Sequence, residues 1–164
     1  MTGIQTVNNR FYLLYGILIC LCICGFALYD LQKRRVPDRA LVFFCPIALL
    51  APFLRAMVFP IWQLFLPSAI VSLGGAAAGF GILLSAALFS EGGAGIGGGD
   101  IKLAGLMGFI YGPSHMIGIL FIASVLAVLA AFIIKSRHGG VLSLPFVPFL
   151  AAGSLAVTIT LLFR

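Results

Sequence analysis

Charged residues, and acids above all, are scarce in this sequence. Only 9% of the 164 residues are charged, and the acids number four. A soluble globular domain is about one quarter charged and about half apolar, whereas 62% of this chain is hydrophobic. A soluble chain of this length could not hide so much apolar surface. The composition therefore excludes an ordinary soluble domain and favours helices in a lipid bilayer, where each helix pairs its own backbone groups.

Residues that bind metals are also few. The two histidines, His115 and His138, are expected on opposite faces of the membrane, each as a solvated loop residue. The cysteines form no C-x-x-C pair, and we interpret them as apolar packing residues. They are Cys20, Cys22, Cys24 and Cys45. A serine or cysteine triad would need a nearby histidine and lacks one. The sequence predicts no metal and no cofactor.

Six apolar runs predict an all-α, polytopic membrane protein with about six transmembrane helices. A span needs about 20 residues at a rise of about 1.5 Å each. The runs cover residues 11–29, 40–59, 62–90, 101–112, 114–134 and 142–163. The fourth run is short and ends at the helix-breaking pair Gly112-Pro113. Its fusion with the fifth run, which would give five helices, is the main alternative. We expect a single membrane domain over residues 1–164.

The net charge of +6 comes from basic residues between the apolar runs. Because they form no aromatic-studded polar surface, nucleic-acid binding is not indicated. With six helices, seven basic residues fall on one side of the membrane and three on the other, which makes the richer side cytoplasmic. Five helices would break this asymmetry. The basic stretch Lys33-Arg34-Arg35 follows the first run as a stop-transfer pattern, so we interpret that run as a mature helix and not a cleaved signal peptide.

All four acids fall at the expected cytoplasmic ends of helices. They are Asp30, Asp38, Glu91 and Asp100. Acids at or within a membrane are costly and mark functional sites. The plainer alternative is that each acid lies among lipid headgroups or pairs with a nearby Lys or Arg.

Asp100 differs because it ends a glycine-rich stretch and opens a helix. The stretch from Glu91 to Gly99 resembles a flexible linker. However, glycines allow a positive φ and a close approach by another chain, and helix N-termini stabilise negative charge. We therefore expect Gly97 and Gly99 to let a substrate backbone approach the Asp100 carboxylate. Two carboxylates held close together would share a proton, which suits hydrolysis of a peptide bond by water.

Three short elements lie in a set order along the chain. They are Tyr29–Asp38, Gly97–Leu103 and Leu144–Gly153. They resemble the D-x-x-x-x-x-I-P-N, G-x-G-D-x-K-L and P-F-x-P-F-L elements of the type IV prepilin peptidases, which are bacterial membrane aspartyl proteases related to archaeal preflagellin peptidases. The resemblance covers essentially the whole chain, although Asp38 stands where the family usually has Asn.

The resemblance implies a six-helix fold in the bacterial inner membrane, with Asp30 and Asp100 as the catalytic acids facing the cytoplasm. The implied substrates are prepilin-like precursors, cut after a glycine and before their hydrophobic helix. Because those substrates commonly carry a Glu just after the cut, Lys102 is a candidate substrate-binding residue; the alternative is that it only fixes topology.

The chain is more similar to the short form of the family, associated with tight-adherence (Flp-type) pili, than to the larger members. Those members add a cytoplasmic region with paired C-x-x-C motifs and methylate the new N-terminus, so methylation is not expected here. Two other functions stay open. One is a non-catalytic membrane component of a pilus or secretion machine. The other is a small transporter, although a transporter would be expected to place acids near mid-membrane.

Overall fold

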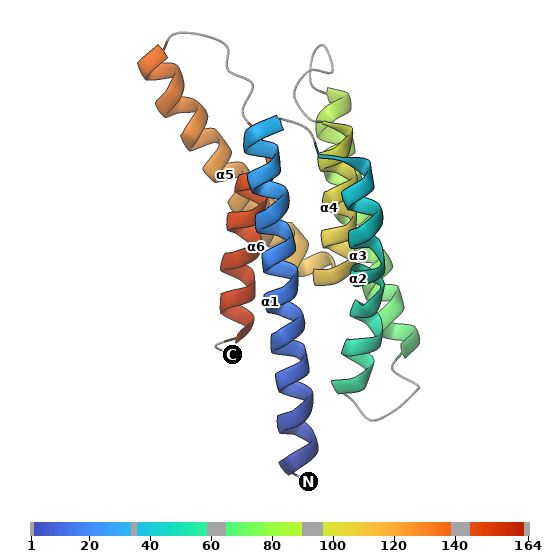
Figure 1. The fold of residues 1–164 in the computed structure, drawn as a ribbon. Helices are drawn as coiled ribbons and strands as arrows, with labels where there is room; N and C mark the ends of the chain where they lie inside the picture. The colour runs from blue at the N-terminus through green and yellow to red at the C-terminus, as the bar shows by residue number, and fades with distance from the viewer. Residues whose placement is uncertain (1, 34–35, 59–64, 90–96, 139–144, 163–164) are drawn as a thin grey trace.

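The described part of the chain is helical. The computed structural model describes residues 2–33, 36–58, 65–89, 97–138 and 145–162. Within these ranges lie six helices and no strand, as Figure 1 shows. The helices are α1 (Thr2–Lys33), α2 (Asp38–Val58), α3 (Phe65–Phe89), α4 (Gly98–Tyr111), α5 (Pro113–His138) and α6 (Val147–Leu162). The predicted all-α class is confirmed.

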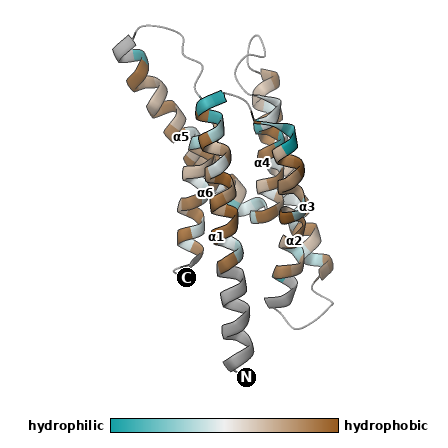
Figure 2. Ribbon diagram, viewed as in Figure 1, coloured by the Kyte–Doolittle hydropathy of each residue, from teal (hydrophilic) through white to brown (hydrophobic). Residues whose placement is uncertain are grey.

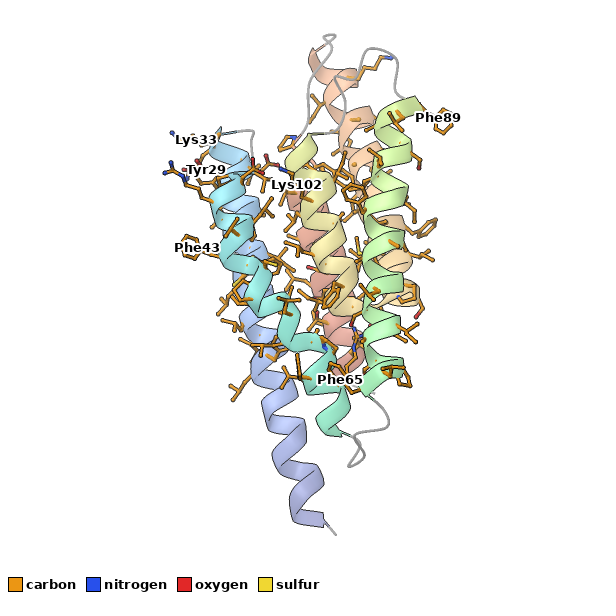
Figure 3. All side chains as sticks on the ribbon, turned by 90° about the vertical axis from the view of Figure 1, so that its right-hand side faces the viewer. Tyr29, Lys33, Phe43, Phe65, Phe89 and Lys102 are labelled. Atoms are coloured by element: carbon orange, nitrogen blue, oxygen red, sulfur yellow. The ribbon has the colours of Figure 1, made fainter. Side chains whose placement is uncertain are left out.

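The surface of the bundle is apolar, as a bilayer requires. Among the residues that the structure describes, three helical segments are long and apolar enough to cross a membrane: Leu14–Lys33, Phe65–Phe89 and Pro113–Lys135. Large apolar side chains such as Phe43 and Phe89 are 78% and 87% exposed and point away from the bundle (Figure 3). The hydrophilic colour in Figure 2 gathers at the upper ends of α1 and α2. The chain is therefore a helical, polytopic membrane protein.

The fourth and fifth helices are separate. Gly112 lies between them with φ of 79°, a backbone conformation that favours glycine, and its N–H donates to the Gly108 carbonyl at 2.8 Å. Pro113 then starts α5, where its missing N–H costs nothing. The five-helix alternative is therefore wrong, because the chain turns at Gly112.

Helices α3 and α4 pack with their backbones almost in contact. A Cβ atom built on Gly75 of α3 would overlap the Gly108 carbonyl of α4, and a Cβ on Gly79 would overlap the Ala104 carbonyl. Small residues permit this approach, which is a common way to join helices in a membrane, where van der Waals contact replaces hydrophobic driving force. The contact holds the middle of α4, around Ala104 and Gly108, against α3.

The end of α4 away from Asp100 is held by Arg55 of α2. Its guanidinium donates to the Ile110 carbonyl in the last turn of α4 and, at 3.2 Å, to the Ser72 hydroxyl of α3. A cation is favourable at a helix C-terminus, where carbonyls lack partners within the helix. Arg55 thus joins three helices at the end of the bundle opposite to the acids.

Candidate active site

Three acids from three helices lie at the same end of the bundle. Asp30 is in the last turn of α1, Asp38 is the first residue of α2, and Asp100 is in the first turn of α4. These helix ends are neighbours at the top of Figure 1. Glu91, the fourth expected member of the cluster, lies outside the described residues. The sequence-based expectation of acids on one face therefore holds for the three that the structure describes.

The carboxylate of Asp30 is buried inside the protein. Its residue is only 4% exposed, and its Oδ2 atom has no hydrogen-bond partner within the described part of the chain. The backbone N–H of Val147, at the start of α6, donates a hydrogen bond to the carboxylate. A buried polar atom without a partner is rare in folded proteins, because it loses its hydration and gains nothing in return. Such an atom suits a site where water or a substrate group completes the hydrogen bonding.

Asp100 is held by the N-terminus of its own helix. Gly97 is the N-cap of α4, with extended φ and ψ of −70° and 142°, and its carbonyl accepts the Asp100 N–H at 3.0 Å. The Asp100 side chain reaches back to the Gly97 N–H, as the acidic member of a capping box does. The position of the carboxylate is therefore set by its own helix end.

The two carboxylates influence each other. The pKa of the Asp100 carboxyl is raised to about 6, first by burial and then by the negative charge of Asp30, while the hydrogen bond from Gly97 opposes both effects. An acid whose pKa lies near neutrality can hold a proton at working pH and release it during a reaction. Asp100 is therefore the acid of the described cluster whose pKa is raised by a second acid.

The raised pKa of Asp100 should appear as a pH dependence of stability. The folded protein keeps this proton up to about pH 6, whereas the ordinary value is 3.8, so the stabilisation is complete below 3.8 and is lost as pH rises through about 6. We expect wild-type protein in detergent to lose thermal stability relative to Asp100→Asn over this range. Melting curves followed by intrinsic fluorescence test this expectation. Parallel pH profiles for the two proteins would contradict it.

The described glycines before Asp100 do not have the positive φ that the sequence led us to expect. Among the described glycines only Gly112 has a positive φ, so a left-handed conformation is not the reason for Gly97 or Gly99. A Cβ on Gly99 would lie 2.8 Å from the Val36 Cβ and 3.0 Å from the Val36 carbonyl oxygen, so the backbone that approaches Gly99 is the protein's own. A Cβ on Gly97 would lie 3.6 Å from an Asp100 oxygen, an ordinary contact. Substrate binding by either glycine stays a prediction.

Gly99→Ala should lower the cleavage rate about 10- to 100-fold, whereas Gly98→Ala should be mild. The added methyl group at position 99 pushes α4 from Val36 and displaces Asp100, and a misplacement of about 1 Å can cost this much. A Cβ on Gly98 meets nothing within 4 Å, so this variant is a matched control on the next residue. Rates are compared at equal enzyme levels in the membrane. Equal rates for the two variants would mean that the contact has no role in the site.

Lys102 is paired with an acid of the protein itself. Its Nζ atom lies 2.7 Å from Oδ1 of Asp38, and the two side chains are 56% and 72% exposed. The plainer interpretation, an acid at the surface paired with a nearby Lys, therefore describes Asp38. Exposed ion pairs contribute about 0–1 kcal/mol to the stability of a fold, so a substrate carboxylate could replace Asp38 as the partner of Lys102 at little cost. The substrate-binding role of Lys102 stays a prediction.

The structure changes the interpretation of two further residues. Val147 was part of the third sequence element but had no assigned role, and its N–H now lies at Asp30. His115 lies in the first turn of α5 and not in a loop, with Nδ1 3.2 Å from the Tyr111 carbonyl. Arg34 and Arg35, from the basic stretch after the first apolar run, lie outside the described residues.

Comparison with known proteins agrees with this geometry. The model of the type IV leader peptidase family matches residues 14–132, a range that includes both Asp30 and Asp100. A curated relative from Bacillus subtilis (strain 168), named prepilin leader peptidase/N-methyltransferase, is 35% identical over 131 residues, which are 79% of this chain and 48% of the relative. The chain thus spans about half the length of that relative. No solved structure matches the chain. This chain belongs to the type IV leader peptidase family.

Proposed function

We propose that this chain is an aspartic endopeptidase that removes the leader peptide of type IV, Flp-like prepilins, with Asp30 and Asp100 as its catalytic acids. The observation that carries the proposal is the meeting of these two acids, distant in sequence, at one end of the bundle, where the charge of one raises the pKa of the other. Membership of the type IV leader peptidase family and the name of the curated relative support the same reaction.

The chemistry follows from one proton shared by two carboxylates. The ionised member takes a proton from a water molecule, whose oxygen forms a bond with the carbonyl carbon of the scissile peptide. The protonated member donates a hydrogen bond to the carbonyl oxygen and supports the charge that develops there. The C–N bond then breaks, and the leaving amine takes a proton from the pair. The titration belongs to the pair, so neither aspartate alone is named the base.

The active site is proposed to face the cytoplasm from the bacterial inner membrane. Five basic residues of the described ranges lie at the end of the bundle that carries the acids: Lys33, Arg39, Lys102, Lys135 and Arg137. Arg10 and Arg55 lie at the opposite end. An excess of Lys and Arg marks the cytoplasmic side of membrane proteins. This distribution supports a site where a precursor can be cut before it crosses the membrane.

Co-expression with prepilin-like genes from the same genome tests the proposal. Cleavage should shorten the precursor by its leader, which is visible on a gel and can be located by N-terminal sequencing of the product. The purified enzyme should work equally well in EDTA, because no metal is expected in the mechanism. An intact precursor in every combination would instead favour a non-catalytic component of the pilus or secretion machine, and inhibition by EDTA that a divalent metal reverses would overturn the two-carboxylate mechanism.

A further inference from the structure

A groove runs down the bundle from the end that carries the acids. Helix α2 supplies one wall and α4 the other, with Ala76 of α3 at its base, and the volume is about 470 Å³. On α2 the lining extends from Asp38 to Leu49, and on α4 from Lys102 to Phe109. Eleven steps along α2 correspond to about 16 Å at about 1.5 Å per residue. The groove thus reaches from the acid end of the bundle well into the apolar zone.

The shape of the groove follows from helical spacing and small side chains. Its α2 residues recur three or four positions apart, so they form one stripe along that helix. Ala76 and Gly105 at the base leave the space between the walls unfilled. Cys45 lies about midway along the α2 wall and is a free, half-buried thiol. The hollow is therefore built into the sequence of three helices.

The polarity of the groove changes abruptly along its length. Its head is the exposed ion pair between Asp38 and Lys102, and all its other lining residues carry apolar side chains, the Cys45 thiol or, at Gly105, none. Lys102 is two residues after Asp100 on the same helix, so the head lies at the level of the proposed catalytic pair. A segment that fits this groove is apolar where it lies in lipid and polar where it emerges at the level of the two carboxylates.

We propose that this groove holds an apolar helix of the substrate, the part of the precursor that continues from the scissile bond into the bilayer. The inference rests on the proposed peptidase function and adds where the substrate binds. The segment must be helical because a chain within lipid has to pair its own backbone groups. The weak, exposed Asp38–Lys102 pair can open toward polar groups of either sign that flank the segment. A segment bound in this way would hold the scissile bond, which precedes it in the precursor, at the level of Asp30 and Asp100.

Two neighbouring leucines on α2 provide a matched test by steric filling. Leu49 and Leu50 are 52% and 50% exposed, yet only Leu49 lines the groove. Leu49→Trp should raise KM for a purified precursor in mixed micelles at least tenfold with little change in kcat. Leu50→Trp places the same bulky side chain on a different face and should leave both constants near the wild-type values. Identical kinetics for the two variants would overturn the inference.

The native thiol in the groove gives a second test that does not depend on the folding of a tryptophan variant. The enzyme variant keeps Cys45 as its sole cysteine and carries Asp100→Asn, so that the precursor stays uncut. This enzyme is mixed with precursors that each carry a single cysteine in the apolar segment. Oxidation should join Cys45 to positions three or four residues apart, the repeat of a helix lying in the groove. The control has Cys45→Ala and Phe43→Cys, because Phe43 is 78% exposed and points away from the bundle (Figure 3).

The outcomes separate this inference from the proposed function. Cross-links at Cys45 with a helical repeat, and few from position 43, support the groove as the binding site. Equal cross-linking from both positions would mean that lipid fills the groove, and would overturn the inference while wild-type cleavage still supported the peptidase. If the wild-type enzyme cut no precursor at all, the proposed function would fail and the inference with it.

Discussion

Replacing either Asp30 or Asp100 with Asn should reduce cleavage about a thousandfold or more while the protein stays folded in the membrane. An amide cannot accept a proton from water or share one with its neighbour, so the reaction loses its general acid and base together, and such groups typically contribute about 10²–10⁴-fold. The structure adds that Asp30 is buried with an oxygen lacking a partner within the described residues. The neutral amide at that position should therefore be tolerated by the fold.

Residues that act as one unit do not lose activity additively, so the double variant should be about as inactive as either single variant. Asp38→Asn is the matched control at the same end of the bundle, because Asp38 is exposed and paired with Lys102, and this variant should retain substantial activity. Leader removal from a co-expressed precursor measures all four proteins. An active Asp30→Asn beside an inactive Asp38→Asn would show that the first catalytic acid is misassigned.

Gly75→Ala should strongly reduce the amount of folded protein, whereas Gly74→Ala should behave like the wild type. A Cβ at position 75 would overlap the Gly108 carbonyl of α4, and backbone cannot move aside as a side chain can. A Cβ at position 74 meets nothing within 4 Å. Overpacking commonly costs about 1–3 kcal/mol, and a clash with backbone belongs at the upper end of that range.

The measurement for the glycine pair is the fraction of protein that stays monodisperse in detergent after heating, at matched expression. The two substitutions have the same chemistry and the same loss of glycine flexibility in α3, so the comparison isolates the contact with α4. Equal melting temperatures for Gly74→Ala and Gly75→Ala would contradict the close packing of α3 on α4. The same packing positions Asp100, so a partly folded Gly75→Ala protein should also be less active.

Much of the fold could be predicted from the sequence because hydropathy and helix breakers act locally. The apolar runs predicted six helices, and the pair Gly112-Pro113 predicted the break between α4 and α5. The scarcity of acids directed attention to Asp30 and Asp100, and the structure places both at the same end of the bundle. In each case the signal is carried by residues close in sequence or by a residue type rare in the chain.

The remaining contacts depend on how helices lie against each other, which local patterns do not specify. The pairing of Lys102 with Asp38 joins different helices, as does the contact of Gly99 with Val36. The contact of Gly99 with the protein's own backbone was not expected from the sequence, and the expected role of the stretch before Asp100 as an opening for substrate stays a prediction. The spacing of Gly75 and Gly79 was a signal of helix packing in the sequence that could have been recognised.

The fixed outer end of α4 has a mechanical consequence. Arg55 and the turn at Gly112 hold one end of this 14-residue helix, and Asp100 lies near the other. A rod anchored in this way moves as a lever about its anchor, and at a length of about 20 Å a tilt of roughly 3° displaces the free end by roughly 1 Å. The separation of the two carboxylates therefore depends on contacts at the opposite end of the bundle, made by Arg55 and the turn at Gly112, as well as on the packing of α4 against α3.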